Sequence, residues 1–198
     1  MKLLLCSDIH CDRAAAHRLV EMSAEADVLV VAGDLAVMRK GLRETVGVLA
    51  DVSCPTVLVP GNGESDAELV EACRAWPAAR VLHGSGCRVD GVDFWGLGAA
   101  VPTTPFGSWS FDLSEEEAER LLADCPSGGV LVTHSPPFGH VDTAGGEHLG
   151  SRSVLRTIER TKPQLVVCGH IHGCWTQEST LGASRIVNAG PGGVWVEI

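Results

Sequence analysis

The sequence has no apolar run that approaches the roughly 20 residues needed to span a bilayer. Its 198 residues contain no cluster of Lys or Arg, and the formal net charge is −10. Neutralising the phosphates of a duplex requires local positive charge, so we expect neither duplex nucleic acid nor a membrane as a partner. Internal repeats, low-complexity tracts and linkers are also missing. Residues 1–198 are therefore expected to form a single domain.

The cysteines lack the spacing of a disulfide framework or of a structural zinc site. There are eight, at Cys6, Cys11, Cys54, Cys73, Cys87, Cys125, Cys168 and Cys174, with no CxxC pair among them. This pattern favours a reduced, cytoplasmic setting. The apolar N-terminal stretch is too short for a signal peptide and is followed directly by Asp8, so we expect it to form a strand.

Five short apolar runs each stop at a side chain that can bind a metal. The runs are Lys2–Cys6, Val28–Ala32, Thr56–Val59, Gly129–Val132 and Gln164–Cys168. They are followed by Asp8 and His10, Asp34, Asn62, His134, and His170 and His172. Such runs predict buried strands, and open α/β sheets place ligand sites at the carboxyl ends of their strands. These ligand types suit two divalent ions, which indicates metal-assisted phosphoester chemistry.

The remaining segments predict an α/β arrangement. Helices are expected at 12–24, 41–52 and 66–76, between the first strands, which favours a parallel sheet. Short strands are expected at 80–82, 87–89, 92–97, 185–187 and 194–198, with helices at 115–123 and 153–160. Ser114 and Glu117 form a capping box for the first of these two helices. Two long irregular loops, 102–109 and 135–150, are expected to be functional.

Taken together, the blocks Asp8-Ile9-His10, Gly33-Asp34, Gly61-Asn62, His134 and Gly169-His170-Ile171-His172 resemble the five signature blocks of the calcineurin-like metallophosphoesterase family. Thr133-His134-Ser135-Pro136-Pro137 and Asn188-Ala189-Gly190-Pro191 are similar to its compact bacterial and archaeal members. The resemblance implies a four-layer α/β/β/α fold, in which two packed mixed β-sheets are flanked by helices.

The resemblance also implies a ligand set for two divalent metal ions. Metal 1 would be held by Asp8, His10, Asp34 and His172, and metal 2 by Asp34, Asn62, His134 and His170. Asp34 would bridge the ions, and Asp34, Asn62 and His134 would take part in catalysis by a metal-bridging hydroxide. Manganese is the first expectation, with Fe, Zn and Ni as alternatives. Alternation along an extended chain would place Asp8 and His10 on one face, and likewise His170 and His172.

One block departs from the family pattern at Gly63, where the family usually has a His that protonates the leaving oxygen. We expect His140 and His148, in the long loop after His134, to bind substrate together with Asn62, and either His could supply the missing proton. Glu64 is expected to be a surface or helix-start acid.

Other side chains have simpler expectations. His17 and His83 should be solvated surface residues. Phe106 and Trp109 could stack on a base or an aryl group, or could anchor their own loop.

The sequence therefore predicts a phosphodiesterase acting on small nucleotide-like or cyclic phosphodiesters. Two alternatives stay open: a non-catalytic scaffold in which metals only stabilise the fold, and a phosphomonoesterase or protein phosphatase. No Arg occurs in the ligand blocks to clamp a phosphate, which argues against a protein phosphatase. The bulk negative charge does not exclude an anionic substrate, because two bound cations offset it locally.

Overall fold

The computed structural model describes residues 1–198, and strands alternate with helices through its first half. The elements there are β1 Lys2–Cys6, α1 Arg13–Ser23, β2 Val28–Val31, α2 Leu42–Leu49, β3 Thr56–Leu58, α3 Asp66–Cys73 and β4 Ala79–Val81. The second half contains β5 Ser85–Val89, β6 Val92–Leu97, α4 Glu115–Leu122, β7 Val130–Thr133, β8 Thr143–Ala144, β9 Glu147–His148, α5 Arg152–Thr161, β10 Leu165–Cys168, a 3₁₀ turn His172–Cys174, β11 Glu178–Leu181, β12 Ser184–Asn188 and β13 Val194–Glu197.

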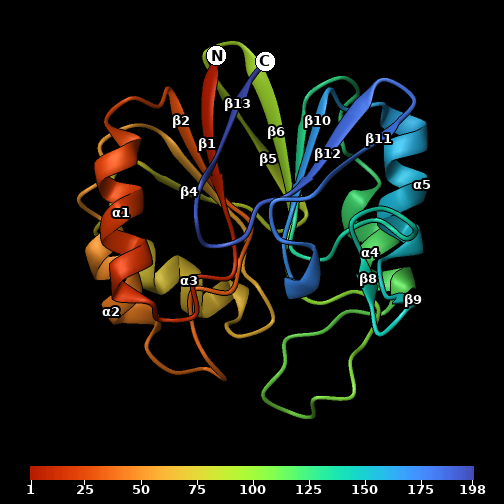
Figure 1. The fold of residues 1–198 in the computed structure, drawn as a ribbon, viewed down its shortest axis with the longest axis horizontal. Coiled ribbons are helices and arrows are strands. Elements are labelled where there is room, and N and C mark those ends of the chain that lie inside the picture. Colours follow the sequence, from red (N-terminus) through yellow and green to blue (C-terminus); the bar gives the residue numbers. More distant parts are fainter.

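The strands form two large mixed sheets. The first has the order β13-β1-β2-β3-β4, and the second has the order β11-β12-β10-β7-β6-β5. Strands β1 to β4 run parallel to one another, as the sequence predicts for the first three, and β13 runs antiparallel to β1. In Figure 1 the two sheets stand side by side, with α1, α2 and α3 covering one and α4 and α5 covering the other.

Three separate apolar clusters lie between these four layers. Because side chains alternate along a strand, Leu3 and Leu5 of β1 face the second sheet, whereas Leu4 and Cys6 face the helices. A third cluster joins the second sheet to α4 and α5, through residues such as Ile158. The expected α/β/β/α architecture with two packed mixed sheets is confirmed.

The predicted helices and strands are present with ends that differ by a few residues. The predicted capping box at Ser114 has formed, and the structure shows a second one at Ser65, with each Ser side chain accepting from the backbone N–H three residues on. The segment 135–150 is not wholly irregular, because β8 and β9 form a short hairpin within it. Gly145 and Gly146 form its two-residue turn with positive φ, but the strands on either side have only two residues each, which is too short to show strand alternation in the sequence.

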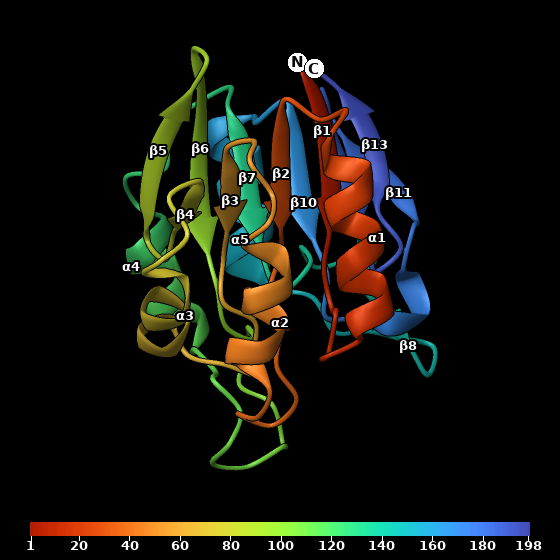
Figure 2. The same ribbon diagram turned by 90° about the vertical axis from the view of Figure 1, so that its left-hand side faces the viewer.

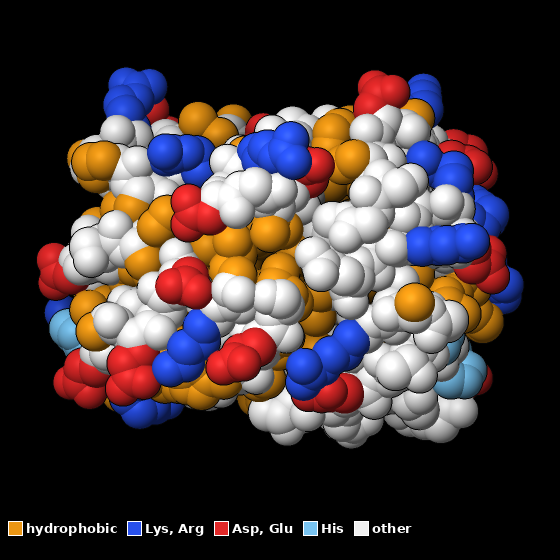
Figure 3. Space-filling view, turned by 90° about the horizontal axis from the view of Figure 1, so that it is seen from above, with side chains coloured by type: hydrophobic (Ala, Val, Ile, Leu, Met, Phe, Trp, Pro, Cys, Tyr) orange, Lys and Arg blue, Asp and Glu red, His pale blue; other side chains and the backbone are white.

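The carboxyl ends of the parallel strands β1, β2, β3, β6, β7 and β10 point to one end of the molecule, opposite the two chain termini (Figures 1 and 2). That end carries the metal-ligand candidates and the long loop after β6. The opposite face shows acidic and basic side chains interspersed rather than gathered by sign (Figure 3). None of the helices has the length and apolar character that crossing a membrane would require.

Candidate metal centre

The structure brings the six predicted acidic and imidazole ligands into two adjacent groups. Asp8, His10 and His172 form one group, and Asp34, His134 and His170 form the other. Within each group the potential ligand atoms all lie within 4.8 Å of one another. We refer to these groups as site 1 and site 2.

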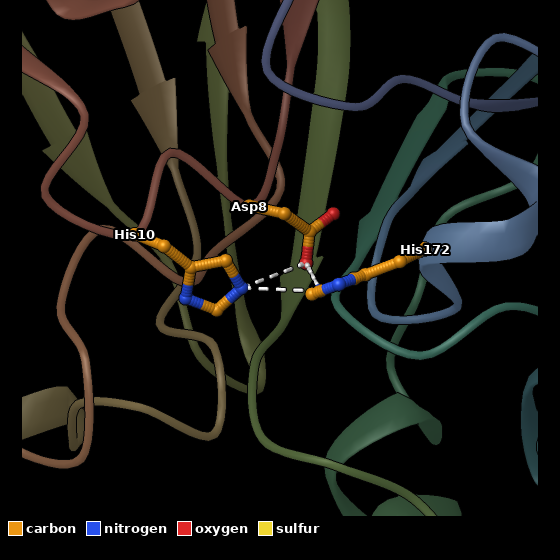
Figure 4. Close-up of side chains that lie close together, drawn as sticks. All are labelled: Asp8, His10 and His172. Atoms are coloured by element: carbon orange, nitrogen blue, oxygen red, sulfur yellow. Dashed lines mark hydrogen bonds and ion pairs between the residues drawn. The ribbon is translucent and has the colours of Figure 1, made fainter.

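Site 1 is the more open group, and its side chains converge from segments far apart in the chain (Figure 4). The Nε2 atoms of His10 and His172 are 3.1 Å apart, and the His172 Nε2 lies 3.6 Å from Asp8 Oδ1. Ligands about 2.1 Å from one ion lie roughly 3 to 3.5 Å from each other, so these separations fit a shared metal ion.

Site 2 is deeply buried, and Asp34 connects it to site 1. The His134 Nε2 lies 3.2 Å from the Asn62 Oδ1 and 3.5 Å from the Asp34 Oδ2. The same Asp34 oxygen lies 3.5 Å from the His10 Nε2 of site 1. The other oxygen of Asp34 accepts a hydrogen bond from the Gly63 backbone N–H at 2.7 Å. One carboxylate oxygen therefore lies between the two groups, as a bridging ligand requires.

The backbone reaches these positions by leaving the extended conformation, which corrects the sequence argument from strand alternation. Four of the ligand residues are left-handed, with φ of 54° at Asp8, 44° at His10, 57° at Asp34 and 66° at His170. Non-glycine residues in this region cost on the order of 1–3 kcal/mol each, and they persist only where surrounding contacts enforce them. The ligand pairs converge because tight turns follow the strands, and not because a strand continues.

Two glycines allow the loops after β2 and β3 to meet at the site. A Cβ on Gly33 would lie 2.6 Å from the Gly61 backbone and 2.7 Å from the His134 Nδ1. A Cβ on Gly61 would overlap Asp34 itself. Only glycine permits this approach, which explains why Asp34 and Asn62 are each preceded by one.

Backbone carbonyls orient two of the imidazoles. The Nδ1 of His10 lies 3.1 Å from the Ala36 carbonyl oxygen, and the Nδ1 of His134 lies 2.8 Å from that of Ala32. A carbonyl only accepts, so each Nδ1 donates to it and each Nε2 faces the site, where its lone pair would bind a metal ion. This is the tautomer that a metal ligand needs, and the donor set therefore fits divalent ions.

Asp8 is held by three donors, two of which bind the same carboxylate oxygen. Ser7 Oγ and Trp175 Nε1 donate to its Oδ2 at 2.5 and 3.1 Å, and the His170 backbone N–H also reaches the carboxylate. The indole of Trp175 packs on the His172 ring, with 4.5 Å between centroids. Trp175 thus orients two side chains of site 1, a role the sequence analysis missed because no local pattern indicates it.

Glu64 is wholly buried, so the expectation of a surface acid is wrong. Its carboxylate accepts from the backbone N–H groups of Leu35, Ala36 and Gly61, at 3.3, 2.9 and 2.8 Å. It therefore fixes the loop that carries Asp34 against the loop that carries Asn62. Burial, reinforced by the nearby Asp34, raises the pKa of Glu64 to about 7 in the metal-free protein.

The charges of the metal-free site also perturb its histidines. Burial would lower the pKa of His134, but the Asp34 carboxylate outweighs it and raises that pKa to about 9. Burial and the neighbouring His134 lower the pKa of His170 to about 4. Adjacent groups shifted in opposite directions are typical of functional sites.

The two loop histidines lie outside the cavity above the site. In the β8–β9 hairpin, Thr143 pairs with His148, so these side chains share one face, while Ala144 and Leu149 on the other face line the cavity. His148 Nδ1 instead lies 2.6 Å from the Oδ1 of buried Asp142. His140 likewise turns away from the cavity, with its Nδ1 2.7 Å from Ser179 Oγ on β11.

The loop after β6 covers the site and is tied to a metal-ligand candidate. The Asn62 Nδ2 donates to Ser110 Oγ at 2.9 Å, and Ser110 in turn donates to the Asp112 carboxylate. This chain turns the Asn62 carbonyl oxygen toward His134. A cavity of about 640 Å³ lies between the ligands and this loop.

Of the two histidines expected on the surface, one is exposed and the other is half-buried. His17 is exposed, as predicted. His83 is half-buried, and its Nδ1 accepts from the Gly98 backbone N–H at 3.2 Å, so the expectation of a solvated side chain is wrong there. The eight cysteines are all free.

Comparison with known proteins agrees with this geometry. The family model described as the calcineurin-like phosphoesterase superfamily domain matches residues 1–196. An uncharacterized protein of Methanocaldococcus jannaschii, MJ1162, is 29% identical over 96% of this chain and 88% of its own length. The UPF0046 protein K07C11.7 of Caenorhabditis elegans is 36% identical over 46% of this chain, and the match spans 31% of that longer protein.

Solved structures share the fold at low sequence identity. The protein TT1561 of Thermus thermophilus has a TM-score of 0.76 at 20% identity, with 96% of this chain and 90% of that chain covered. The phosphopantetheinyl hydrolase PptH of Mycobacterium tuberculosis has a TM-score of 0.67 at 16% identity, covering 96% and 88%. A dimetal phosphatase of Danio rerio has a TM-score of 0.62 at 13% identity, with the same coverage.

Proposed function

The chain belongs to the calcineurin-like phosphoesterase superfamily, and from that premise we propose that it is a dinuclear metal-dependent phosphodiesterase acting on small nucleotide-like or cyclic phosphodiesters. One observation carries the proposal: a single oxygen of Asp34 lies 3.5 Å from imidazoles of both ligand groups. Two divalent ions bound there would activate water and neutralise charge on the phosphoryl group. Manganese is our first candidate, and the eight free cysteines support a cytoplasmic location.

The protein's own residues would position the reacting groups. Asp8, His10, Asp34 and His172 would hold metal 1, while Asp34, Asn62, His134 and His170 would hold metal 2. Glu64 and Ser110 keep Asp34 and Asn62 in place through the contacts described above. Such a complete and pre-oriented ligand set argues against the alternative of a scaffold without catalysis.

The preference for diesters rests on the absence of cationic side chains near the site. No Lys or Arg lines the cavity, so nothing besides the metal ions would balance the second negative charge of a phosphomonoester. A diester carries one charge only. The same absence separates this cavity from that of a protein phosphatase with Arg clamps.

The test is hydrolysis of matched aryl phosphodiester and phosphomonoester substrates by the manganese-loaded protein. We expect metal-dependent turnover with the diester favoured. A protein that binds two ions yet hydrolyses neither ester would be the scaffold alternative. Faster turnover of the monoester would establish a phosphomonoesterase instead.

The identity of the leaving group should matter strongly, because Gly63 has no side chain that could donate a proton at the position where the family usually has a His. General acid assistance is typically worth about 10²–10⁴-fold, so its absence penalises poor leaving groups most. We expect a steep negative slope of log rate against leaving-group pKa across aryl phosphodiesters. A flat slope with chemistry rate-limiting would mean that another acid acts there.

Restoring the family's usual His at this position is not a simple replacement. A Cβ on Gly63 would lie 2.8 Å from the Ala36 carbonyl oxygen and 3.2 Å from the Asp34 Oδ1. We therefore expect Gly63→His to displace the loop that carries Asn62 and to weaken binding of metal 2. A variant that binds both ions normally and shows a shallower slope would contradict this expectation.

A further inference from the structure

The cavity above the metal centre has two chemically distinct parts. Its floor is formed by ligand candidates from both sites, namely His10, Asp34, Asn62, His170 and His172. Its outer wall comes mainly from the loop after β6 and from the end of the β8–β9 hairpin. A volume of about 640 Å³ is within the usual range for a small-molecule site.

The outer wall gathers apolar side chains that remain exposed. Phe106 and Trp109 stack nearly parallel, with centroids 5.7 Å apart and an interplanar angle of 6°. Phe106 is 50% exposed, and Leu149 on the hairpin side is 45% exposed. Large apolar side chains exposed together beside a polar floor are typical of a ligand contact, because leaving them in water is unfavourable. We call Phe106, Trp109 and Leu149 the apolar wall.

Two Arg side chains are already engaged in contacts with the loops at this end of the molecule. Arg39 Nε donates to the Trp109 carbonyl oxygen at 2.7 Å, and its Nη1 pairs with Glu68. The Arg152 guanidinium lies over the Phe138 ring, 4.0 Å from its centroid. Neither Arg lines the cavity, so a second phosphate on a substrate would find no positive partner there.

Resting on the proposed function, we infer that the substrate carries a single phosphoryl group and a flat, uncharged apolar group that packs against Phe106, Trp109 and Leu149. The phosphoryl group would lie over the metal ligands on the floor. Esters with further phosphates, such as nucleoside polyphosphates and oligonucleotides, are excluded as good substrates. Hydrolysis forms a bond from water oxygen to phosphorus and breaks the ester P–O bond. The leaving oxygen keeps the electron pair and takes up one proton, which gives an alcohol and a phosphomonoester.

The first test compares two aryl phosphodiesters that differ only in an added phosphate on the ring, using the manganese-loaded protein. We expect kcat/KM for the unmodified ester to be at least about tenfold higher, because the added phosphate would enter a cavity whose lining has no Lys or Arg. Phe106→Ala should lower kcat/KM for that ester by about five- to a hundredfold, the usual range for losing one aromatic stacking partner. Val70→Ala serves as the control, because Val70 is similarly exposed at 49% but lies on α3, outside the cavity.

The second test adds a cation to the cavity. Thr103→Arg places a guanidinium in the lining, and we expect it to raise the relative kcat/KM of the doubly phosphorylated ester severalfold. Binding of phenyl phosphonate, measured by calorimetry, should weaken in Phe106→Ala and stay unchanged in Val70→Ala. This readout requires no turnover.

The outcomes separate this inference from the proposed function. Absence of hydrolysis with every ester, although both metals are bound, would refute the proposed function. Hydrolysis that is equal for both aryl esters, and equally affected by Phe106→Ala and Val70→Ala, would overturn the inference and leave the proposed function standing. Loss of phosphonate binding in Phe106→Ala, with unchanged metal content, would support the inference.

Discussion

The two ligand groups differ in their contact with solvent although they share a carboxylate. In site 1 the side chains of His10 and His172 are 30% and 51% exposed. In site 2 those of Asp34 and His134 are 5% and 0% exposed. Site 2 is thus part of the core and is preorganised by it, whereas site 1 depends on loops at the rim of the cavity. We expect the inner ion to be held more tightly and exchanged more slowly than the outer one.

The largest expected effect comes from removing the element that the two sites share. Asp34→Asn should abolish nearly all hydrolysis, because it weakens the connection between both ions. His134→Ala should do the same by removing a ligand of site 2. His17→Ala, on the exposed face of α1, should retain wild-type turnover, and His83→Ala is a poorer control because His83 is half-buried. Full activity of Asp34→Asn with two ions bound would refute the dinuclear mechanism.

The variant Trp175→Phe tests whether site 1 can be weakened without affecting the buried site 2. This variant keeps an aromatic ring against His172 but loses the N–H that donates to Asp8. Removing an outer partner of a metal ligand typically costs about 10–100-fold in metal affinity. We expect this loss at site 1 alone, with site 2 unchanged, in titrations that resolve two binding events. Equal weakening of both sites would indicate a general structural effect.

A chelator should remove the metal ions from the two sites at different rates. A chelator is expected to remove one ion quickly and the second slowly, and metal content over time would show two phases. A ligand that binds only the native state stabilises it, so each loss should lower the melting temperature, by several degrees in total. A single phase of release would show that the two sites open together.

The smallest expected effect is that of replacing Glu64, whose carboxylate holds the loops that carry Asp34 and Asn62. In the metal-free protein its pKa is raised to about 7 from a usual 4.5, so the folded state keeps a proton that the unfolded chain has lost between these values. The contribution of Glu64 to the free energy of unfolding therefore falls as the pH rises from 4.5 to about 7.

Glu64→Gln should remove that contribution to the pH dependence. The amide offers one accepting oxygen to the three N–H groups, so we also expect about 1–3 kcal/mol lower stability at a pH of about 5. Urea unfolding at several pH values would measure both effects. A stability difference between variant and wild type that stays constant with pH would contradict the raised pKa.

The metal-ligand candidates were predictable because each follows a short apolar run. In a parallel sheet, such runs must end together at one edge, so Asp34 and Asn62 had to lie close together if the strands were assigned correctly. His134 follows β7 of the second sheet, and it joins them because the two sheets pack against each other. The four-layer fold was expected from the resemblance to the metallophosphoesterase family, whereas the alternation of apolar runs and helices by itself predicted only a parallel α/β sheet. The left-handed turns at Asp8 and His10 were not predictable, because contacts with distant loops impose them.

Glu64 and His148 show where local pattern fails. Both are polar residues in glycine-containing segments, where neither helical nor strand periodicity indicates an inward or outward direction. Glu64 is buried only because two loops meet over it. His148 faces away from the cavity only because a two-residue strand pairs it with Thr143. Such placements depend on tertiary contacts that a single sequence does not encode locally.

The position of Trp175 should make its fluorescence sensitive to metal binding at site 1. An indole whose ring packs on His172 and whose N–H donates to Asp8 lies close enough to an outer ion to respond to it optically. Filling site 1 with a paramagnetic ion should quench the emission of this indole, while a diamagnetic ion should leave most of it. The chain has five Trp residues, so the Trp175 signal is obtained as the difference between the wild type and Trp175→Phe, and that difference should follow the filling of site 1.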